Sequence, residues 1–300
     1  MGGYKEKWLL NSTKGRGEKM TIPTDYLTAP NLFLKGKKKQ FAYREMGEKK
    51  GIPLVLLTHL SATLDNWDPL LINTLAENHW VIVFDNVGVG LSDGKVPKTI
   101  KEMADGVLEF IRGLNVEQVD LLGLSMGGMI AQELVAKEPL LVRKLILVGT
   151  GPRGGEGISE VTNVTNKDFL RSILTRKDIK TYLFFTETEN GRIKAAEFLE
   201  RINTRSQVKD KNIHFSSYQN QLTAINRWGK EKSADLSTIN QQTLIVNGDH
   251  DRMVPTVNSY DLAKRIPKST LKIYPDAGHG SLFQFPIDFS QIVSEFIYAK

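Results

Sequence analysis

The 300-residue chain contains no cysteine. This absence excludes a disulfide framework, a cysteine nucleophile and a thiolate metal site, and it favours a cytoplasmic location. Long apolar runs are missing as well. The longest one near the N-terminus is Trp8-Leu9-Leu10, which is far shorter than the apolar region of a signal peptide, and no run approaches the length of a membrane-spanning helix. We therefore expect a soluble protein without a membrane partner.

A surplus of negative charge is also absent, because the net charge is +6. Residues 1–50 hold twelve Lys and Arg against five Asp and Glu, a surplus of seven, so the remaining 250 residues carry about minus one. Positive charge confined to an N-terminal arm and to the segment Lys35-Gly36-Lys37-Lys38-Lys39 is typical of a solvated tail and a hairpin turn. We expect no nucleic-acid partner, and we leave residues 1–19, upstream of Met20, out of the predicted fold.

The sequence does contain a regular alternation of short apolar runs with amphipathic segments. Apolar runs without polar alternation are typical of strands covered by helices on both faces, and they occur at 53–58, 80–85, 119–122, 144–149, 243–247 and 271–274. Helical spacing of apolar residues follows at 126–134, before Pro139, and at 103–114. This order predicts an α/β fold with a mostly parallel sheet. Two further runs, 32–34 and 41–44, predict an antiparallel hairpin at one edge.

One long stretch interrupts the alternation. Residues 151–235 begin with a glycine-rich segment and carry several helical patterns with aromatic residues, but no convincing strand pattern. Helices inserted between two strands are expected to form a cap, or lid, over the carboxyl ends of the strands. The alternative is a helical layer that only stabilises the sheet. The predicted division is an arm at 1–29, a core at 30–150 and 236–300, and a cap at 151–235.

Two serines lie in the pattern Gly-x-Ser-x-Gly. Ser125 directly follows a buried strand pattern and precedes a long helix, which is the arrangement of a nucleophile elbow. Ser92 is followed by glycine and proline residues that delay the next helix. We therefore predict that Ser125 is the nucleophile. The first N–H groups of its helix, beginning with Met126, would stabilise negative charge that develops nearby.

A serine nucleophile requires a base, and the base requires an acid that orients it. Of the five histidines, only His279 follows a late strand in a glycine-bounded loop. The acid is expected in the loop after the preceding strand, which offers Asp249 and Asp251, and the order Ser, Asp, His is the one expected for this architecture. His250 has no second ligand cluster and is interpreted as a solvated loop residue rather than a metal ligand. No partner is discernible for His79 or for the remaining His214.

These motifs together resemble the α/β-hydrolase superfamily, from about residue 30 to the C-terminus. The resemblance is carried by Gly123-Leu-Ser125-Met-Gly127, Asp85-Asn-Val-Gly88-Val-Gly90-Leu-Ser92, Gly248-Asp-His-Asp251-Arg-Met-Val-Pro255 and Gly278-His279-Gly280. It implies that Asp251 is the acid, because the acid usually stands four residues before that proline, with Asp249 as the alternative. It also implies that the loop ending in Ser92 is structural.

The chain departs from the superfamily pattern after the first buried strand. Many members carry His-Gly there, followed by a backbone N–H that completes an oxyanion hole, whereas this chain has His59-Leu60-Ser61. We assign the Leu60 N–H to the oxyanion hole together with Met126, and the Ser61 N–H is the alternative. His59 is interpreted as a residue that shapes the loop.

The resemblance implies a serine hydrolase that cleaves a small, partly apolar ester or lactone through an acyl-enzyme, with no cofactor and no metal ion. Similar proteins with the same triad perform cofactor-free perhydrolysis, as haloperoxidase-like enzymes do, or hydrolyse carbon–carbon bonds. A ligand receptor without catalysis is the non-enzymatic alternative. Dehalogenases and epoxide hydrolases of this fold are disfavoured, because they use an aspartate where Ser125 stands. The expected partner is a small-molecule substrate, and no particular oligomeric state is predicted.

Overall fold

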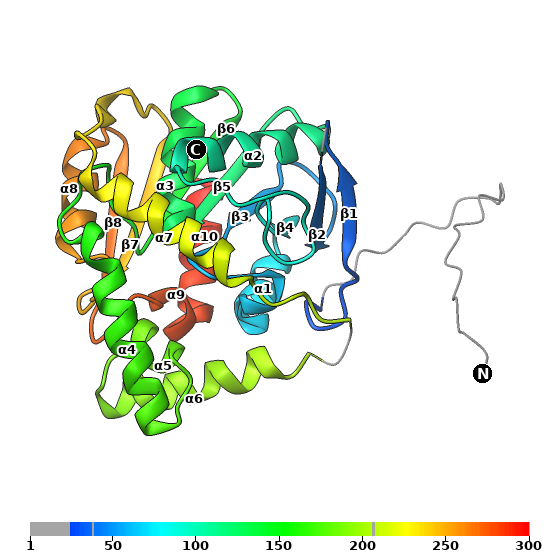
Figure 1. The fold of residues 1–300 in the computed structure, drawn as a ribbon. Helices are drawn as coiled ribbons and strands as arrows, with labels where there is room; N and C mark the ends of the chain where they lie inside the picture. The colour runs from blue at the N-terminus through cyan, green and yellow to red at the C-terminus, as the bar shows by residue number, and fades with distance from the viewer. Residues whose placement is uncertain (1–24, 38, 206–207, 300) are drawn as a thin grey trace, which may run out of the picture.

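The protein is built around one eight-stranded sheet (Figure 1), and its computed structural model describes residues 25–37, 39–205 and 208–299. The strand order is β1-β2-β4-β3-β5-β6-β7-β8. β1 and β2 pair antiparallel, as do β2 and β4, and all other neighbours are parallel. The predicted α/β class, the mostly parallel sheet and the edge hairpin are therefore confirmed. The strands are β1 (Leu32–Lys35), β2 (Gln40–Met46), β3 (Leu54–Leu57), β4 (Val81–Phe84), β5 (Val119–Leu124), β6 (Val142–Val148), β7 (Gln242–Gly248) and β8 (Ser269–Tyr274).

Each face of the sheet is covered by helices. In β3, Val55 and Leu57 belong to one apolar cluster while Leu54 and Leu56 belong to the other, because successive side chains of a strand point to opposite faces. Burial on both faces explains why the strands lack polar alternation. The first cluster includes residues of α2 (Ile100–Gly113), α3 (Met126–Lys137) and α8 (Val257–Arg265), and the second includes residues of α1 (Pro69–Ala76), α9 (Ser281–Gln284) and α10 (Pro286–Tyr298).

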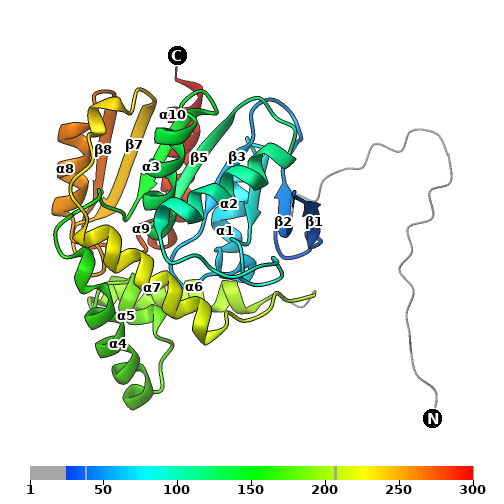
Figure 2. The same ribbon diagram turned by 45° about the horizontal axis from the view of Figure 1, so that its top comes forward.

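Four helices are inserted between β6 and β7, and we refer to them as the inserted helices. They are α4 (Val161–Thr175), α5 (Lys180–Phe184), α6 (Glu189–Asn203) and α7 (Phe215–Lys230), and the described residues of this stretch contain no strand. In Figures 1 and 2, α4, α5 and α6 lie together beyond one end of the sheet, and α7 runs between them and the core. An ion pair joins α6 to the core, since Arg201 donates from Nε and Nη2 to the fully buried Asp68 carboxylate at 2.8 and 2.6 Å. That these helices act as a lid stays a prediction. The described residues also form three short 3₁₀ helices, at Leu64–Asn66, Ile158–Glu160 and Leu236–Thr238.

The N-terminal region lies only partly within the described residues. Residues 1–24 of the predicted arm, and Lys38 of the lysine-rich turn, fall outside them. Residues 25–29 are packed against the protein: Tyr26 and Ala29 are buried, and Arg205 donates to the carbonyl oxygens of Tyr26, Leu27 and Ala29 at 2.8 to 3.0 Å. Among the helices of the described ranges, none is both long enough and apolar enough to cross a bilayer.

His79 has a partner that could not be discerned from the sequence. Its Nε2 lies 2.9 Å from the hydroxyl of Ser294 on α10, and its ring stacks on Tyr298 with a centroid distance of 5.3 Å. Burial, and to a lesser extent the charge of Arg143, lower the pKa of His79 from 6.5 to about 4. The folded protein therefore holds this histidine in its neutral form.

Acid should destabilise the protein through His79. Between pH 6.5 and pH 4 this histidine is protonated in the unfolded chain but not in the folded chain. Its contribution to the free energy of unfolding is therefore fully present above pH 6.5, and it declines by up to about 1.4 kcal/mol per pH unit below that pH. The variant His79→Gln removes this contribution. We expect the difference in unfolding free energy between the native protein and the variant, measured with urea, to shrink by about 2 kcal/mol from pH 7 to pH 5. A difference that stays constant with pH would contradict the assignment.

Candidate active site

Ser125 stands at the sharp turn between β5 and α3. Its φ of 56° and ψ of −117° are unusual for a residue with a Cβ atom. Two hydrogen bonds hold this backbone in place: the Ser125 N–H donates to Val148 O at 2.8 Å, and Thr150 Oγ1 donates to Ser125 O at 2.8 Å. A conformation of this kind persists only where its surroundings enforce it, and such conformations are concentrated at functional sites.

The two glycines of the Gly-x-Ser-x-Gly pattern are required by close packing. A Cβ atom on Gly123 would lie 2.5 Å from Gly127 O, and one on Gly127 would lie 2.3 Å from Leu57 O. Both distances are shorter than non-bonded contact allows, so only glycine lets the strand, the turn and the helix approach one another here. The pattern around Ser125 therefore has a structural cause.

His279 and Asp251 form a buried pair. His279 lies in the loop after β8, and its Nδ1 is 2.8 Å from Asp251 Oδ2. The other carboxylate oxygen of Asp251 accepts from the N–H groups of Met253 and Val254 at 2.8 and 3.0 Å. Both oxygens are therefore bonded, so the carboxylate is fixed in the plane that orients the imidazole. The next residue of the loop, Gly280, donates its N–H to Phe184 O at 2.9 Å, which ties the loop to α5.

Asp249, the alternative acid, does not contact His279. Its Oδ1 lies 2.6 Å from His250 Nδ1 and accepts the Ala277 N–H at 3.2 Å. The His250 side chain is 66% exposed. Within the described ranges, no group of three or more His, Asp or Glu side chains is placed to hold a metal ion. The structure thus brings Asp251, and not Asp249, to His279.

The two alternative donors of the loop after β3 differ in their availability. The Ser61 N–H donates to Gln221 Oε1 of α7 at 2.8 Å. In the described part of the chain, no hydrogen bond engages the N–H of Leu60 or of Met126, the first residue of α3. Leu60 and Met126 can therefore donate to a ligand without breaking an existing bond, whereas Ser61 cannot. No motif in the sequence pointed to Gln221, which belongs to an ordinary amphipathic helix pattern.

His59 is bonded to its own loop. Its Nδ1 lies 2.8 Å from Leu60 O, and its ring packs edge-on against Phe184 at a centroid distance of 4.9 Å. Burial lowers the pKa of His59 from 6.5 to about 3. At neutral pH the ring is uncharged, and with Leu60 O as its neighbour it carries its proton on Nδ1. This geometry agrees with a loop-shaping residue.

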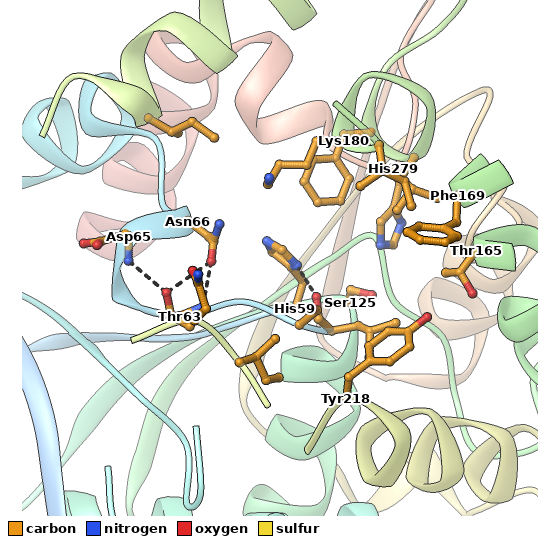
Figure 3. A pocket seen from close by; sticks show the side chains of 18 of the residues that line it. His59, Thr63, Asp65, Asn66, Ser125, Thr165, Phe169, Lys180, Tyr218 and His279 are labelled. Atoms are coloured by element: carbon orange, nitrogen blue, oxygen red, sulfur yellow. Dashed lines mark hydrogen bonds between the residues drawn. The ribbon is translucent and has the colours of Figure 1, made fainter. Parts of the chain in front are cut away.

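Ser125 and His279 line the same cavity, which has a volume of about 790 Å³ (Figure 3). The inserted stretch contributes most of the apolar lining and also polar side chains such as Thr165 and Lys180, and Figure 3 shows Thr63, Asp65 and Asn66 together on another side. The apolar lining consists of Leu60, Phe169, Ile179, Leu183, Phe184, Ile202, Ile213, Phe215, Tyr218 and Met253, and the polar lining includes Thr63, Asp65, Asn66, Lys180, Asn203, Lys209 and Asn212.

Ser92 does not line this cavity, and its hydrogen bonds are made elsewhere. Its hydroxyl accepts from the Ala42 N–H at 2.9 Å and donates to Asp85 O at 2.8 Å, so it joins β2 to the loop after β4. The Asp85 side chain in turn accepts from the N–H groups of Leu64 and Leu91 at 3.0 and 3.1 Å. The Ser92 hydroxyl and the Asp85 carboxylate thus both bind backbone groups of neighbouring segments, which agrees with a structural role for this loop.

Comparison with known proteins defines the class of this chain. The family model of the alpha/beta hydrolase fold matches residues 52–286, and the chain belongs to this family. A solved alpha/beta hydrolase fold protein from Chitinophaga pinensis is 35% identical, covers 92% of this chain and 100% of its own length, and superposes with a TM-score of 0.87.

Two relatives with named activities are also similar. The 2-hydroxy-6-oxononadienedioate/2-hydroxy-6-oxononatrienedioate hydrolase of Escherichia coli is 28% identical over 242 residues, which are 77% of this chain and 80% of the relative. RutD of Rhizobium rhizogenes, a protein named for carbamate hydrolysis, is 26% identical over 254 residues, which are 82% of this chain and 93% of the relative. Hydrolase is the class of activity that these matches support.

Proposed function

We propose that the protein is a serine hydrolase that cleaves a small, partly apolar carboxylic ester or lactone. The observation that supports this most strongly is the buried His279–Asp251 pair in the cavity that Ser125 also lines, with Ser125 held at a strained turn. A hydroxyl is a weak nucleophile unless a neighbouring base removes its proton, and an oriented imidazole is the usual base. The proposed roles follow from this arrangement.

In the proposed mechanism, Ser125 Oγ attacks the substrate carbonyl while His279 Nε2 takes the hydroxyl proton. Asp251 holds the Nδ1–H of His279 and stabilises the imidazolium that forms. The Leu60 and Met126 N–H groups bind the oxyanion of the tetrahedral intermediate. His279 then returns the proton to the leaving oxygen, and a water molecule activated by the same histidine hydrolyses the acyl-enzyme. These steps need no cofactor.

The cavity suggests the kind of substrate. Its volume of about 790 Å³ lies in the range of small-molecule sites. Its aromatic and aliphatic side chains suit an apolar acyl or alcohol group, and its polar side chains can bind a hydroxyl, amide or carboxylate. Carbon–carbon bond hydrolysis is the second candidate, and the named activity of the Escherichia coli relative favours it. Perhydrolysis would use the same residues, and a receptor without catalysis would not require a paired His279.

A series of p-nitrophenyl esters from acetate to octanoate tests the proposal. We expect turnover to be highest for the shorter chains, and a burst of p-nitrophenol, equal to the protein concentration, if deacylation is slow. γ- and δ-lactones form a second set, and a vinylogous diketone, followed by loss of its ultraviolet absorbance, a third. Turnover of the diketone alone would favour the second candidate. A protein that turns over none of the three sets is not the proposed hydrolase.

A further inference from the structure

The loop after β3 is held at one peptide group by two side chains. The carbonyl of the peptide group between Leu60 and Ser61 is bound by His59 Nδ1 at 2.8 Å, and its N–H is bound by Gln221 Oε1 at 2.8 Å. His59 belongs to the loop itself, whereas Gln221 lies on α7, 160 residues further along the chain. The orientation of this peptide group therefore depends on an inserted helix.

Ser61 needs this restraint because its backbone is strained. Its φ is 64°, in the left-handed region that a residue with a Cβ atom rarely adopts. A rotation of the peptide group between Leu60 and Ser61 would relieve the strain, and both hydrogen bonds oppose that rotation. Without Gln221, only the bond from His59 would remain.

The acceptor on α7 is itself held in a fixed position. Ser217, Asn220 and Gln221 lie three and four residues apart, so they share one face of the helix. Ser217 Oγ donates to Gly88 O and Asn220 Nδ2 donates to Val96 O, each at 3.0 Å. Gln221 is only 1% exposed, so water does not compete for its bond to the loop. The core thus positions α7, and α7 positions the Gln221 amide.

The Leu60 N–H belongs to the preceding peptide group and shares the Leu60 Cα with the restrained one. A change in one peptide plane is therefore transmitted to the other through the Leu60 backbone angles. An oxyanion donor is effective only when it points at the place where the negative charge develops. We propose that Gln221 is a positioning residue: by holding the Ser61 N–H, it aims the Leu60 N–H at the tetrahedral oxyanion. The inference rests on the proposed serine hydrolase function.

The variant Gln221→Met tests the proposal, because methionine has a similar length and no oxygen. We expect kcat for p-nitrophenyl acetate to fall by about 10- to 100-fold. This is no more than the fall expected when a whole oxyanion-hole donor is removed. KM should change by less than about threefold. Affinity for an alkyl trifluoromethyl ketone, which adds to the serine as a tetrahedral oxyanion, should weaken by the same factor as kcat/KM. Affinity for the matching methyl ketone, which stays trigonal, should not change.

Gln219→Met is the matched control, because Gln219 lies on the exposed side of the same helix. We expect its kcat to stay within about twofold of the native value. Should Gln221→Met not fold, Gln221→Asn carries the same test, since its amide is one methylene too short to reach Ser61. Thermal melting of each variant shows whether the protein is folded at the assay temperature.

Two results would overturn the inference: an unchanged kcat in a folded Gln221 variant, or a lower kcat with unchanged affinity for the trifluoromethyl ketone. Either result, in a protein whose native form hydrolyses esters, leaves the proposed function standing. A native protein that hydrolyses neither the esters nor the lactones, and that does not bind the trifluoromethyl ketone, contradicts the proposed function, and the role of Gln221 fails with it.

Discussion

Replacing Ser125 by alanine is expected to lower ester turnover by at least about 10⁴-fold, because it removes the attacking oxygen. Stability should hardly change, since the Ser125 side chain makes no capping hydrogen bond to α3, and the bonds that hold the turn come from the Ser125 backbone. The measurement is kcat/KM with p-nitrophenyl acetate, together with the rate of p-nitrophenol release in the first turnover. Both should disappear together if the acyl group is transferred to Ser125.

Ser92→Ala is the control for this prediction, because both serines lie in the same five-residue pattern. The Ser92 hydroxyl joins Ala42 N–H to Asp85 O, and both residues are buried. Its loss leaves two backbone groups without a partner, so we expect about 1–3 kcal/mol of destabilisation in urea unfolding with nearly native turnover. If Ser125→Ala kept its activity and Ser92→Ala lost it while folded, the assignment of the nucleophile would be reversed.

Asp251→Asn is expected to lower kcat by roughly 10³- to 10⁴-fold with little effect on folding. An asparagine can still accept the Met253 and Val254 N–H groups through its oxygen, as Asp251 Oδ1 does. Its NH₂ group would then face His279 Nδ1, which favours the tautomer with the proton on Nε2. That tautomer cannot take a proton from Ser125, and the stabilising negative charge is lost as well. Steady-state kinetics at pH 7 to 8, with a melting curve for each protein, makes this measurement.

Asp249→Asn separates this effect from a general effect of charge in the same loop. Asp249 bonds His250 and the Ala277 N–H, and an asparagine can retain the latter bond. We expect kcat to stay within about threefold of the native value, since Asp249 does not contact His279. Equal losses in the two variants would show that Asp251 does not have the distinct role proposed for it.

The fold could be predicted from the sequence because its signals are local. Runs such as 53–58 and 80–85 lack polar residues because helices cover both faces of β3 and β4. The spacing of Met126, Met129, Ile130 and Leu134 predicted α3, which ends at Lys137, two residues before Pro139. Helix and strand periodicities involve neighbours no more than four residues apart, so one sequence is enough to reveal them.

Local patterns in the sequence give the order of strands and helices along the chain, and they give Ser125 and His279 as candidates with two possible acids, Asp249 and Asp251. The glycines beside Ser125 are required by contacts within a few residues or with the adjacent strand, so the elbow leaves a clear pattern. Contacts in the folded protein settle which of the two carboxylates meets His279 and which loop N–H is left free. Those outcomes depend on contacts across 28 residues between Asp251 and His279 and across 160 between Ser61 and Gln221. Such contacts form when the loops at the ends of the strands pack against one another and against the inserted helices, and they leave no periodic pattern in the sequence.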